Sequence, residues 1–589
     1  MNKKNESLKT IYNTAVEYFR KKDFKTAETY CLKILSINSN HFNSISMLAT
    51  IEALKGNFEK AKELLTKGIE IQPNNVVAIL NLGTACKEIG KLEEAISYYN
   101  KVLHLAPNHT NAHYNLGLTF YKLRQLKKAK NYFKKTVDIQ DNYAVAFFWL
   151  GNTHTELKEY NDAVSCYQKA IEINSNLVTA HNNLGLVFNN LNDFKSAITS
   201  FQNAVKKQPN HAGAHHNLAL TFKNLGKINE AINSHEMAIK YEPENLAHDY
   251  YLSEIKKETL DSNLKNKINK ILGNNKSKNI TNVVFGNYLL AKYERKLKKY
   301  EKEFEFLIKG HQNYFNSQKK KFDLGIKYCF DDVLQISEGV KVKKDGNEKY
   351  NKIKPIFIIG VPRCGSTLVE QIIGSGKKII SIGEETAVFE NYINKKILDK
   401  QSLNLGNVTE VRNELYNIYQ QKGLLSKKYD YTFSDKSLNN FFYLELIKDI
   451  YPEAKIIHCK RDTLSSIMSI FQNNLTDLAW THNLDHIFKY FDNYFRIIEN
   501  YNEVYPNALY ELEFEKLTIN SEEESKKLMK FCELPWDNSC LEFYKKKDLV
   551  SKTASNIQIR EAIYQHSLEK YLPYKKLLEK HGKKYSWFN

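Results

Sequence analysis

Residues 81–109 read NLGTACKEIGKLEEAISYYNKVLHLAPNH, and variants of this stretch fill the first half of the chain. Alanine recurs every 34 residues, at Ala27, Ala61, Ala95, Ala129, Ala163, Ala197 and Ala231. Leucine keeps the same period, followed each time by Gly or Ala, at Leu48, Leu82, Leu116, Leu150, Leu184 and Leu218. A third phase holds residues that favour a break between helices, at Ser39, Pro73, Pro107, Asp141, Ser175, Pro209 and Pro243. A fixed period over seven copies indicates a repeat architecture.

Each copy predicts two amphipathic helices. Small residues such as Gly83 and Ala95 allow close helix crossing, and neither helix can bury its apolar stripe alone, so the copies must stack. The pattern L-G-x-x-x…A-x-x-x-[YF]…P resembles the tetratricopeptide repeat (TPR), which implies a right-handed superhelix with a concave groove. We expect a TPR domain of seven repeats over residues 6–245, forming an α-solenoid.

The helices expected to line the groove carry a stripe of histidine and asparagine: His113, Asn115, His154, His181, Asn182, Asn183, His215, His216 and Asn217. Asparagine ladders can hydrogen-bond an extended peptide without reading its side chains. The stripe is therefore interpreted as a groove that contacts a protein or glycan, with an unspecialised solvated face as the alternative. We do not expect a metal site.

Residues 246–350 lose the 34-residue phase but keep helical periodicity, and we expect a helical bridge or degenerate repeat there. At Pro355 the pattern changes to strand, loop and helix. The short apolar runs PIFIIG (355–360) and KIIHC (455–459) are typical of buried parallel strands, and each is followed by a helix. Residues 351–589 therefore predict one α/β domain whose parallel sheet has helices on both faces.

The first strand leads into GVPRCGSTLVEQII (360–373). Gly360 and Gly365 bracket four residues as in G-x-x-x-x-G-K-[ST], but Ser366 stands where a nucleoside-triphosphatase has lysine. Backbone N–H groups at the start of the helix can still cradle an anion. Arg363 adds a guanidinium suited to a terminal oxyanion group. The loop predicts a phosphate ligand other than a nucleoside triphosphate and disfavours a kinase.

The second strand runs into KIIHCKRDTLSSIMSIF (455–471). Arg461 follows the strand, and Ser469 lies eight residues later on the next helix. Because ligands of open α/β sheets bind at the carboxyl ends of the strands, this pair points into the same crevice as the first loop. Two phosphate sites suit a ligand that is phosphorylated at two separated positions.

The motifs P-R-C-G-S-T and R-D-x(6)-S together resemble the sulfotransferases that use 3′-phosphoadenosine 5′-phosphosulfate (PAPS). The resemblance covers about 350–575 and implies a P-loop-like sulfotransferase fold. It assigns the 5′-phosphosulfate to Arg363, Cys364, Gly365, Ser366 and Thr367, and the 3′-phosphate to Arg461 and Ser469. The usual loop of that family is P-R-S-G-T-T, so Cys364 and Ser366 are departures from it.

Three further stretches agree with the resemblance. GEET (383–386) is similar to the stretch that supplies the general base of tyrosylprotein sulfotransferases, which implies Glu385, with Glu384 as the alternative. SDKSLNNFFYL (434–444) places Lys436 like the lysine that assists sulfuryl transfer. KTASNIQIREAIYQHSLEKY (552–571) resembles the late loop that closes over the nucleotide, which implies contacts from Ser555, Arg560 and Lys570. The histidines that could serve as rival bases are His458, His482 and His486.

The resemblance implies a PAPS-dependent sulfotransferase that needs no metal and acts on a protein tyrosine, glycan or other hydroxyl. Its repeats would recruit the acceptor or a partner. Ala387 stands where tyrosylprotein sulfotransferases have an arginine, so the acceptor stays open. The domain order resembles a bacterial sulfotransferase group. The alternative is a TPR interaction scaffold whose nucleotide-binding domain is catalytically inactive.

The net charge of +19 suggests a polyanionic partner, but only 8 of the 86 basic residues are arginine and 78 are lysine. The lysines spread along the whole chain, whereas Arg363, Arg461 and Arg560 fall in the proposed nucleotide-binding segments. We therefore expect no nucleic-acid partner. No window approaches the ~18–20 apolar residues of a membrane span, and the start has no apolar signal core. Eight scattered cysteines without a CxxC pair favour reduced thiols and a cytoplasmic location.

Overall fold

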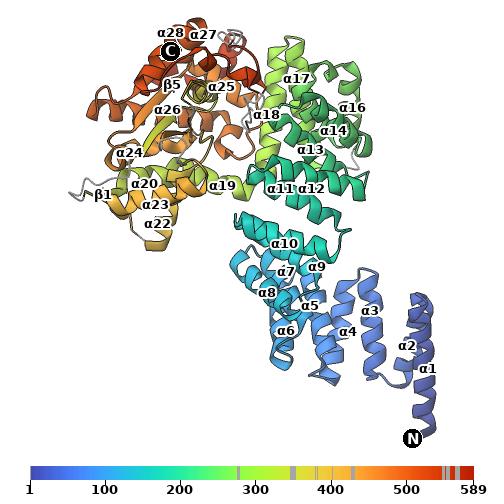
Figure 1. Cartoon of the computed structure of the whole chain (residues 1–589). Coiled ribbons are helices and arrows are strands. Elements are labelled where there is room, and N and C mark those ends of the chain that lie inside the picture. The colour runs from blue at the N-terminus through green and yellow to red at the C-terminus, as the bar shows by residue number, and fades with distance from the viewer. Residues whose placement is uncertain are drawn as a thin grey trace. The chain divides into compact units, whose positions relative to one another are not determined.

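The structure is a computed structural model. It describes residues 2–274, 279–344, 353–378, 380, 382–400, 402–425, 432–546, 551, 557–563 and 571–588, apart from the side chains of residues 2–7, 399 and 400. The chain divides into two compact units, Met1–Leu218 and Ala219–Asn589, with the division inside helix α13. Figure 1 labels the elements of both units.

The first unit consists of helices joined by short turns. Its helices are α1 (Asn2–Arg20), α2 (Phe24–Ile37), α3 (Phe42–Leu54), α4 (Phe58–Ile71), α5 (Val76–Glu88), α6 (Leu92–Leu105), α7 (Thr110–Lys122), α8 (Leu126–Ile139), α9 (Ala144–Glu156), α10 (Tyr160–Ile173), α11 (Val178–Asn190), α12 (Phe194–Lys207) and the start of α13 (Ala212–Asn224). From α1 to α12, successive helices pack against each other, as the repeat pattern predicts.

A glycine on the first helix of a repeat lies against an aromatic ring on the second. A Cβ added to Gly117 would come within 2.6 Å of the Phe133 ring, and Gly83, Gly151 and Gly185 face Tyr99, Tyr167 and Phe201 in the same way. These rings are almost fully buried. The glycine therefore provides the space in which the ring of the same repeat packs.

The second unit begins with helices and continues into the α/β domain. Its helices are the end of α13, α14 (Ile228–Tyr241), α15 (Leu246–Ile255), α16 (Ser262–Gly273), α17 (Ile280–Lys296), α18 (Tyr300–Ser317), α19 (Lys319–Lys327), α20 (Val333–Gly339), α21 (Ser366–Ile373), α22 (Val388–Lys400), α23 (Val408–Gln421), α24 (Leu444–Ile450), α25 (Thr463–Phe471), α26 (Leu484–Val504), α27 (Phe514–Ile519), α28 (Ser521–Phe531) and α29 (Lys575–Gly582).

A four-stranded parallel sheet lies in this unit, in the order β4-β2-β5-β6. The strands are β2 (Lys354–Ile359), β4 (Thr432–Asp435), β5 (Lys455–Lys460) and β6 (Tyr510–Glu513). A separate pair joins β1 (Lys341–Lys343) to β3 (Asn404–Asn407). From Pro355 onward every residue of β2 is buried, because both faces of this central strand are covered.

The expected fold class is confirmed: an α-solenoid precedes an α/β domain with a parallel sheet. One buried apolar cluster joins Leu246, Tyr250 and Val284 on helices α15 and α17 to Ile356 and Phe357 on β2. The bridge helices thus share a hydrophobic core with the sheet. The domain boundaries drawn from the sequence stay a prediction.

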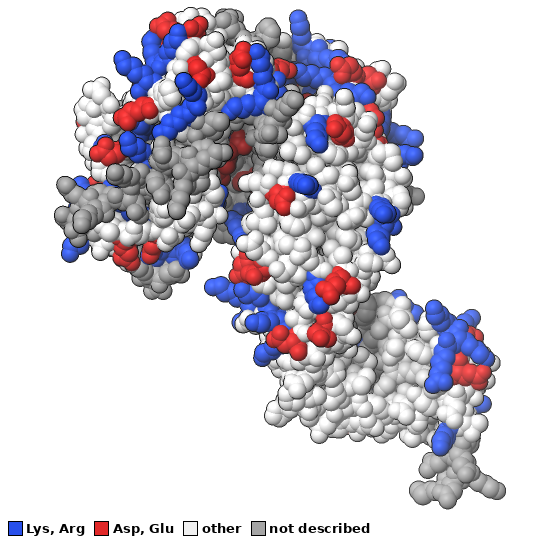
Figure 2. All heavy atoms as spheres, in the orientation of Figure 1, with Lys and Arg blue, Asp and Glu red and all other residues white. Residues whose placement is uncertain are grey.

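Figure 2 shows basic and acidic side chains interspersed on the face that it draws. Many lysines are paired with acids, for example Lys62 with Glu94 at 2.6 Å and Lys223 with Glu254 at 2.6 Å. Within the described residues, no helix combines the length and the apolar character that a membrane crossing requires.

We expect Gly117→Ala to destabilise the first unit by about 1–3 kcal/mol, because the new methyl group overlaps the Phe133 ring. The matched control is Gly213→Ala on α13, where the added methyl meets only His211 at 3.4 Å, an ordinary contact. Alanine should stabilise that helical position by up to ~1 kcal/mol. Urea unfolding followed by circular dichroism measures both variants, and equal midpoints would contradict the packing argument.

Candidate functional site

The order of the strands creates a crevice at the carboxyl edge of the sheet. The chain passes from β2 to β4 on one side and from β5 to β6 on the other side. The connections that leave the neighbouring strands β2 and β5 therefore diverge, and open α/β sheets bind ligands at such a point. Residues 360–367 follow β2, and Arg461 follows β5 directly.

The loop after β2 adopts left-handed backbone conformations at several residues. Arg363 has φ of 71° and Gly365 has φ of 97°. A Cβ on Gly365 would lie 2.3 Å from the Phe514 ring, so only glycine fits between the loop and that ring. Helix α21 begins directly after Gly365, at Ser366. The loop therefore presents backbone N–H groups and the positive end of a helix at the crevice.

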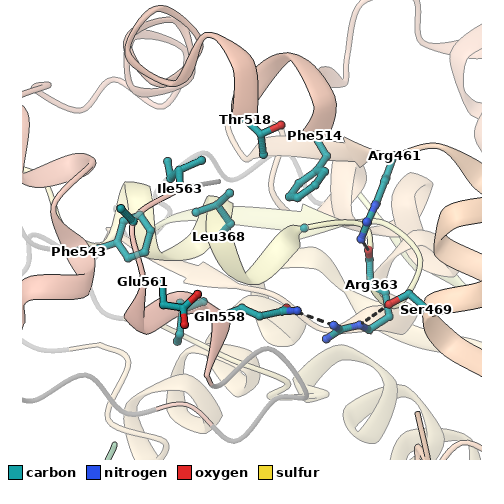
Figure 3. A pocket seen from close by; sticks show the side chains of 13 residues that line it. Arg363, Leu368, Arg461, Ser469, Phe514, Thr518, Phe543, Gln558, Glu561 and Ile563 are labelled. Atoms are coloured by element: carbon teal, nitrogen blue, oxygen red, sulfur yellow. Dashed lines mark hydrogen bonds between the residues drawn. The ribbon is translucent and has the colours of Figure 1, made fainter. Parts of the chain in front are cut away.

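Arg363 connects the two predicted phosphate sites. Its Nε donates to Ser469 Oγ at 3.1 Å, and its Nη2 donates to Gln558 Oε1 at 3.2 Å. Arg461 Nη1 donates to the Arg363 carbonyl at 2.9 Å. Figure 3 shows these side chains around one pocket. The structure thus brings the loop after β2 and the arginine–serine pair after β5 together, as the sequence predicts.

Arg461 lies beside an aromatic wall. Its guanidinium lies 4.7 Å from the centroid of the Phe514 ring, within the range of a cation–π contact. The next residue, Asp462, caps helix α25 by accepting a hydrogen bond from the Ser465 N–H at 2.7 Å. The cap fixes the start of the helix that carries Ser469.

The pocket includes residues that the sequence analysis missed. It is lined by Arg363, Gly365, Leu368, Arg461, Ser469, Phe514, Thr518, Phe543, Gln558, Ile559, Glu561, Ala562 and Ile563. Phe514 and Thr518 come from α27, which follows strand β6 directly. The run YELEF (510–514) could have indicated a third strand ending at the same edge, but no charged motif marks it.

Beside this pocket, Lys436 faces the two predicted base candidates. Its Nζ lies 3.0 Å from Glu385 Oε1 and 3.8 Å from Glu384 Oε1. Lys436 is 1% exposed. Burial opposes its charge, but the carboxyl groups of Glu385, Glu370 and Glu384 outweigh that effect and raise the pKa of Lys436. An ammonium ion is therefore maintained in a buried position.

The two glutamates differ in access. The Glu385 side chain is 41% exposed and that of Glu384 only 18%. Glu384 Oε1 also accepts a hydrogen bond from Ser551 Oγ at 2.9 Å. Glu385 is therefore the more accessible carboxylate beside the buried ammonium.

The turn that carries both glutamates is strained, with φ of 50° at Glu385 and 48° at Ala387. Backbone hydrogen bonds with Lys436 hold it, from the Glu385 N–H to the Lys436 carbonyl at 3.1 Å and from the Lys436 N–H to the Gly383 carbonyl at 3.0 Å. Two buried serines add support. Ser434 Oγ accepts from the Gly383 N–H at 3.2 Å, and Ser437 Oγ accepts from the Ala387 N–H at 2.8 Å.

Each of these serines donates in turn to a buried carboxyl group. Ser434 Oγ donates to Glu370 Oε1 at 2.9 Å, and Ser437 Oγ donates to Asp435 Oδ1 at 2.6 Å. Burial raises the pKa of Glu370 to about 8. Tyr419 and Asn440 also donate to Asp435, at 2.7 and 3.2 Å. The turn thus rests on two serine–carboxyl pairs, which sequence motifs did not reveal.

Several predicted site residues are not among the described residues that line the pocket. Cys364 is buried and outside the pocket lining; its sulfur accepts hydrogen bonds from Cys459 and from Ser366, which lower the pKa of the Cys364 thiol. The Arg560 guanidinium donates to the Asn224 carbonyl at 2.8 Å. Ser555 and Lys570 fall outside the described residues. Ser366 and Thr367 open helix α21 and are buried.

Of the rival histidines, His458 and His482 are buried and His486 is half-buried. His458 forms a hydrogen bond with the Tyr494 hydroxyl. His486 is not among the pocket-lining residues and lies near the Phe330 ring. His482 Nδ1 lies 2.9 Å from His311 Nδ1, and His311 Nε2 donates to the Phe471 carbonyl at 2.8 Å. Burial lowers the pKa of His311 to about 4, and burial with the charge of His311 lowers that of His482 to about 2. Both stay neutral near pH 7.

The histidine stripe of the repeats is largely structural. His113 Nε2 bonds the Pro107 carbonyl at 2.9 Å, and His181 bonds the Ser175 carbonyl at 3.3 Å. The asparagines form a ladder, for example Asn183 Nδ2 to Asn152 Oδ1 at 2.9 Å.

His154, Glu159 and Asp162 lie together in the first unit. Their possible metal-ligand atoms are all within 4.8 Å of one another. Lys130 Nζ already donates to both Glu159 oxygens, at 2.8 and 2.9 Å. This lysine balances the carboxylate charge without an ion.

Comparison with known proteins matches the first part of the chain to repeat models and the later part to a different family. Residues 355–538 match the model of the sulfotransferase family. TPR models match residues 83–123, 151–192, 110–143, 178–211 and 200–233. A model of subunit 3 of the anaphase-promoting complex matches residues 20–102. The chain is a tetratricopeptide-repeat protein with a domain of the sulfotransferase family.

An uncharacterized protein of Aquifex aeolicus (strain VF5) is 31% identical over 308 residues, which cover 49% of this chain and 40% of that protein. The chain thus spans less than half the length of this relative. Several solved structures are similar to parts of the chain. YrrB, described as a TPR protein with an unusual peptide-binding site, is 24% identical over 32% of this chain and 96% of its own, with a TM-score of 0.29. PilF of Pseudomonas aeruginosa is 17% identical over 36% and 96%, with a TM-score of 0.33.

The buried histidine pair predicts a loss of stability in mild acid. A histidine with a lowered folded-state pKa stabilises the fold above its unfolded pKa of ~6.5, and that stability falls as pH drops through the folded value. We expect the free energy of unfolding to fall by about 1 kcal/mol per histidine between pH 6.5 and pH 5.5. Urea unfolding at the two pH values measures it, and a His311→Gln/His482→Gln variant should lose this part of the difference. An equal pH dependence in the variant would contradict the interpretation.

Proposed function

We propose that this chain is a sulfotransferase that moves a sulfuryl group from PAPS to a hydroxyl acceptor, while its repeats recruit the acceptor or a partner. The observation that carries the proposal is the junction of Arg363 with Ser469 and Arg461 in one crevice. It joins the two segments expected to bind separate phosphate groups. Membership of the sulfotransferase family supports the class of reaction.

The residues present fit such a donor. Arg363 and Arg461 offer guanidinium groups to the anionic ends, and the start of α21 adds backbone N–H groups. Phe514, Phe543 and Ile563 give the pocket apolar walls that suit a flat base. When bound, PAPS supplies the sulfuryl group. We assign its 5′-phosphosulfate to the loop from Arg363 to Thr367 and its 3′-phosphate to Arg461 and Ser469.

The chain's own residues supply positioning, charge and a base. Glu385 accepts the proton of the acceptor hydroxyl, a role supported by its exposure beside Lys436. Glu384 is the alternative base, although Ser551 and partial burial restrain it. Lys436 stabilises negative charge on the bridging oxygen as an ammonium held in a dry environment. The reaction needs no metal.

The acceptor is a hydroxyl of a protein tyrosine, a glycan or another molecule. The asparagine ladder, with Asn152, Asn182, Asn183 and Asn217 in mutual hydrogen bonds, supports a groove for an extended chain. All eight cysteines are free thiols, which supports the proposed cytoplasmic location. A scaffold with an inactive nucleotide-binding domain is the competing function.

We expect Arg461→Ala to lower the affinity for 3′,5′-bisphosphoadenosine at least ~10-fold, because a hydrogen bond to a charged group contributes about 1.5–3 kcal/mol. Isothermal titration calorimetry with the full chain measures it. The matched control is Arg496→Ala, which removes an exposed arginine of α26 that is not among the pocket-lining residues. Unchanged affinity in Arg461→Ala would reject the assigned site.

Glu385→Gln should lower kcat by ~10²–10⁴-fold, because the variant lacks a base, while leaving affinity for 3′,5′-bisphosphoadenosine intact. Transfer of labelled sulfate from PAPS into a cell lysate provides the assay, with Glu499→Gln, an exposed glutamate of α26, as the control. A larger loss in Glu384→Gln than in Glu385→Gln would exchange the two roles. Binding without transfer in the wild-type chain would favour the scaffold.

A further inference from the structure

The turn after helix α13, in the last repeat, differs from equivalent turns in one respect. Gly56, Gly90 and Gly226 occupy the same turn position in their repeats, with φ of 82°, 84° and 72°. A Cβ on Gly56 or Gly90 would meet open space. On Gly226 it would lie 2.3 Å from Nη1 of Arg560. A side chain would therefore strain the backbone at all three turns. Only at Gly226 would it also collide with another residue, Arg560.

Arg560 contacts this turn by a hydrogen bond to the C-terminal end of helix α13. Its Nη2 donates to the Asn224 carbonyl at 2.8 Å, and the Ser551 N–H approaches the same oxygen at 3.5 Å. Asn224 is the last residue of α13, where carbonyl groups lack partners within the helix and the helix dipole favours a cation. The contact therefore satisfies a helix terminus and a guanidinium together.

The residues held by this contact belong to the pocket and to the catalytic centre. Gln558, which accepts from Arg363, and Glu561 line the pocket on either side of Arg560 in sequence. Ser551 donates to Glu384 at 2.9 Å. All of these residues lie in the compact unit Ala219–Asn589, which already includes the end of α13.

We propose that the α13–α14 turn positions the pocket wall 558–563 and Ser551, with Arg560 as the clamp between them. Arg560 is then a positioning residue that acts through Gln558 and its neighbours, and the last repeat is a structural part of the catalytic unit. The inference rests on the proposed function, since its binding readout uses 3′,5′-bisphosphoadenosine.

The experiment compares Gly226→Ala with Gly90→Ala in the full chain. Both variants impose the same left-handed alanine on an inter-helix turn, but only the first displaces Arg560. We expect Gly226→Ala to weaken 3′,5′-bisphosphoadenosine binding about 10-fold, and Gly90→Ala to leave it within about twofold. Equal affinities in the two variants would overturn the proposal.

A double-mutant cycle separates the clamp from a direct ligand. If Arg560 acts through the turn, Arg560→Ala and Gly226→Ala disrupt one contact, and their losses of affinity are not additive. Additive losses, as for an arginine that binds the nucleotide itself, would overturn the clamp.

Amide hydrogen exchange of residues 557–563 gives a readout without ligand. We expect faster exchange there in Gly226→Ala and unchanged exchange in Gly90→Ala. If the wild-type chain does not bind 3′,5′-bisphosphoadenosine, the proposed function fails. The exchange measurement still tests whether the α13–α14 turn positions residues 557–563 through Arg560. Unchanged exchange in Gly226→Ala would then reject it.

Discussion

The buried ammonium of Lys436 constrains how the groups around it are arranged at the carboxyl edge of the sheet. Removing a charge from water is costly, and this one is offset by carboxyl groups, of which Glu385 is 3.0 Å away. Those carboxyl groups sit on a strained turn, so the turn must be held by contacts other than the ion pair. Ser434 and Ser437 provide them, each between a backbone N–H of the turn and a buried carboxyl group.

The carboxyl groups of Asp435 and Glu370, which accept from the two serines, differ in the number of hydrogen bonds they receive. Asp435 accepts hydrogen bonds from Tyr419, Ser437 and Asn440, so its buried oxygens are well compensated. Glu370 accepts only from Ser434 within the described hydrogen bonds, and burial raises its pKa to about 8. Burial therefore opposes a negative charge on Glu370, and this carboxyl group is less well compensated than that of Asp435.

Much of this arrangement could be predicted from sequence where it depends on local pattern. The 34-residue period predicts the solenoid, and the apolar runs before Gly360 and Arg461 predict strands β2 and β5. Strands β4 and β6 were missed because TFSD and YELE mix polar and apolar residues and are short. The GEET and DKS motifs indicated Glu385, Glu384 and Lys436, which the structure brings together. No motif indicates Glu370, which lies 64 positions from Ser434.

Contacts that no sequence motif indicates explain the remaining differences. Arg560 was assigned to the nucleotide from its motif, but its observed partner Asn224 is 336 positions away. Helical periodicity placed His113 and His181 on the groove face. It could not show that each ring turns back to a carbonyl six residues earlier, because that contact depends on how the preceding turn folds.

The parallel sheet explains why one short edge gathers so much chemistry. Each of its four strands delivers a site residue soon after its carboxyl end: Arg363 after β2, Lys436 after β4, Arg461 after β5 and Phe514 after β6. Because neighbouring strands lie only ~4.8 Å apart, groups far apart in the chain become neighbours without any long loop. The sheet order then divides the edge: Lys436 and the carboxylates lie beyond β4, and the pocket lies beyond β2, β5 and β6. Arg363, on the loop after the inner strand β2, stands between the two halves of this edge.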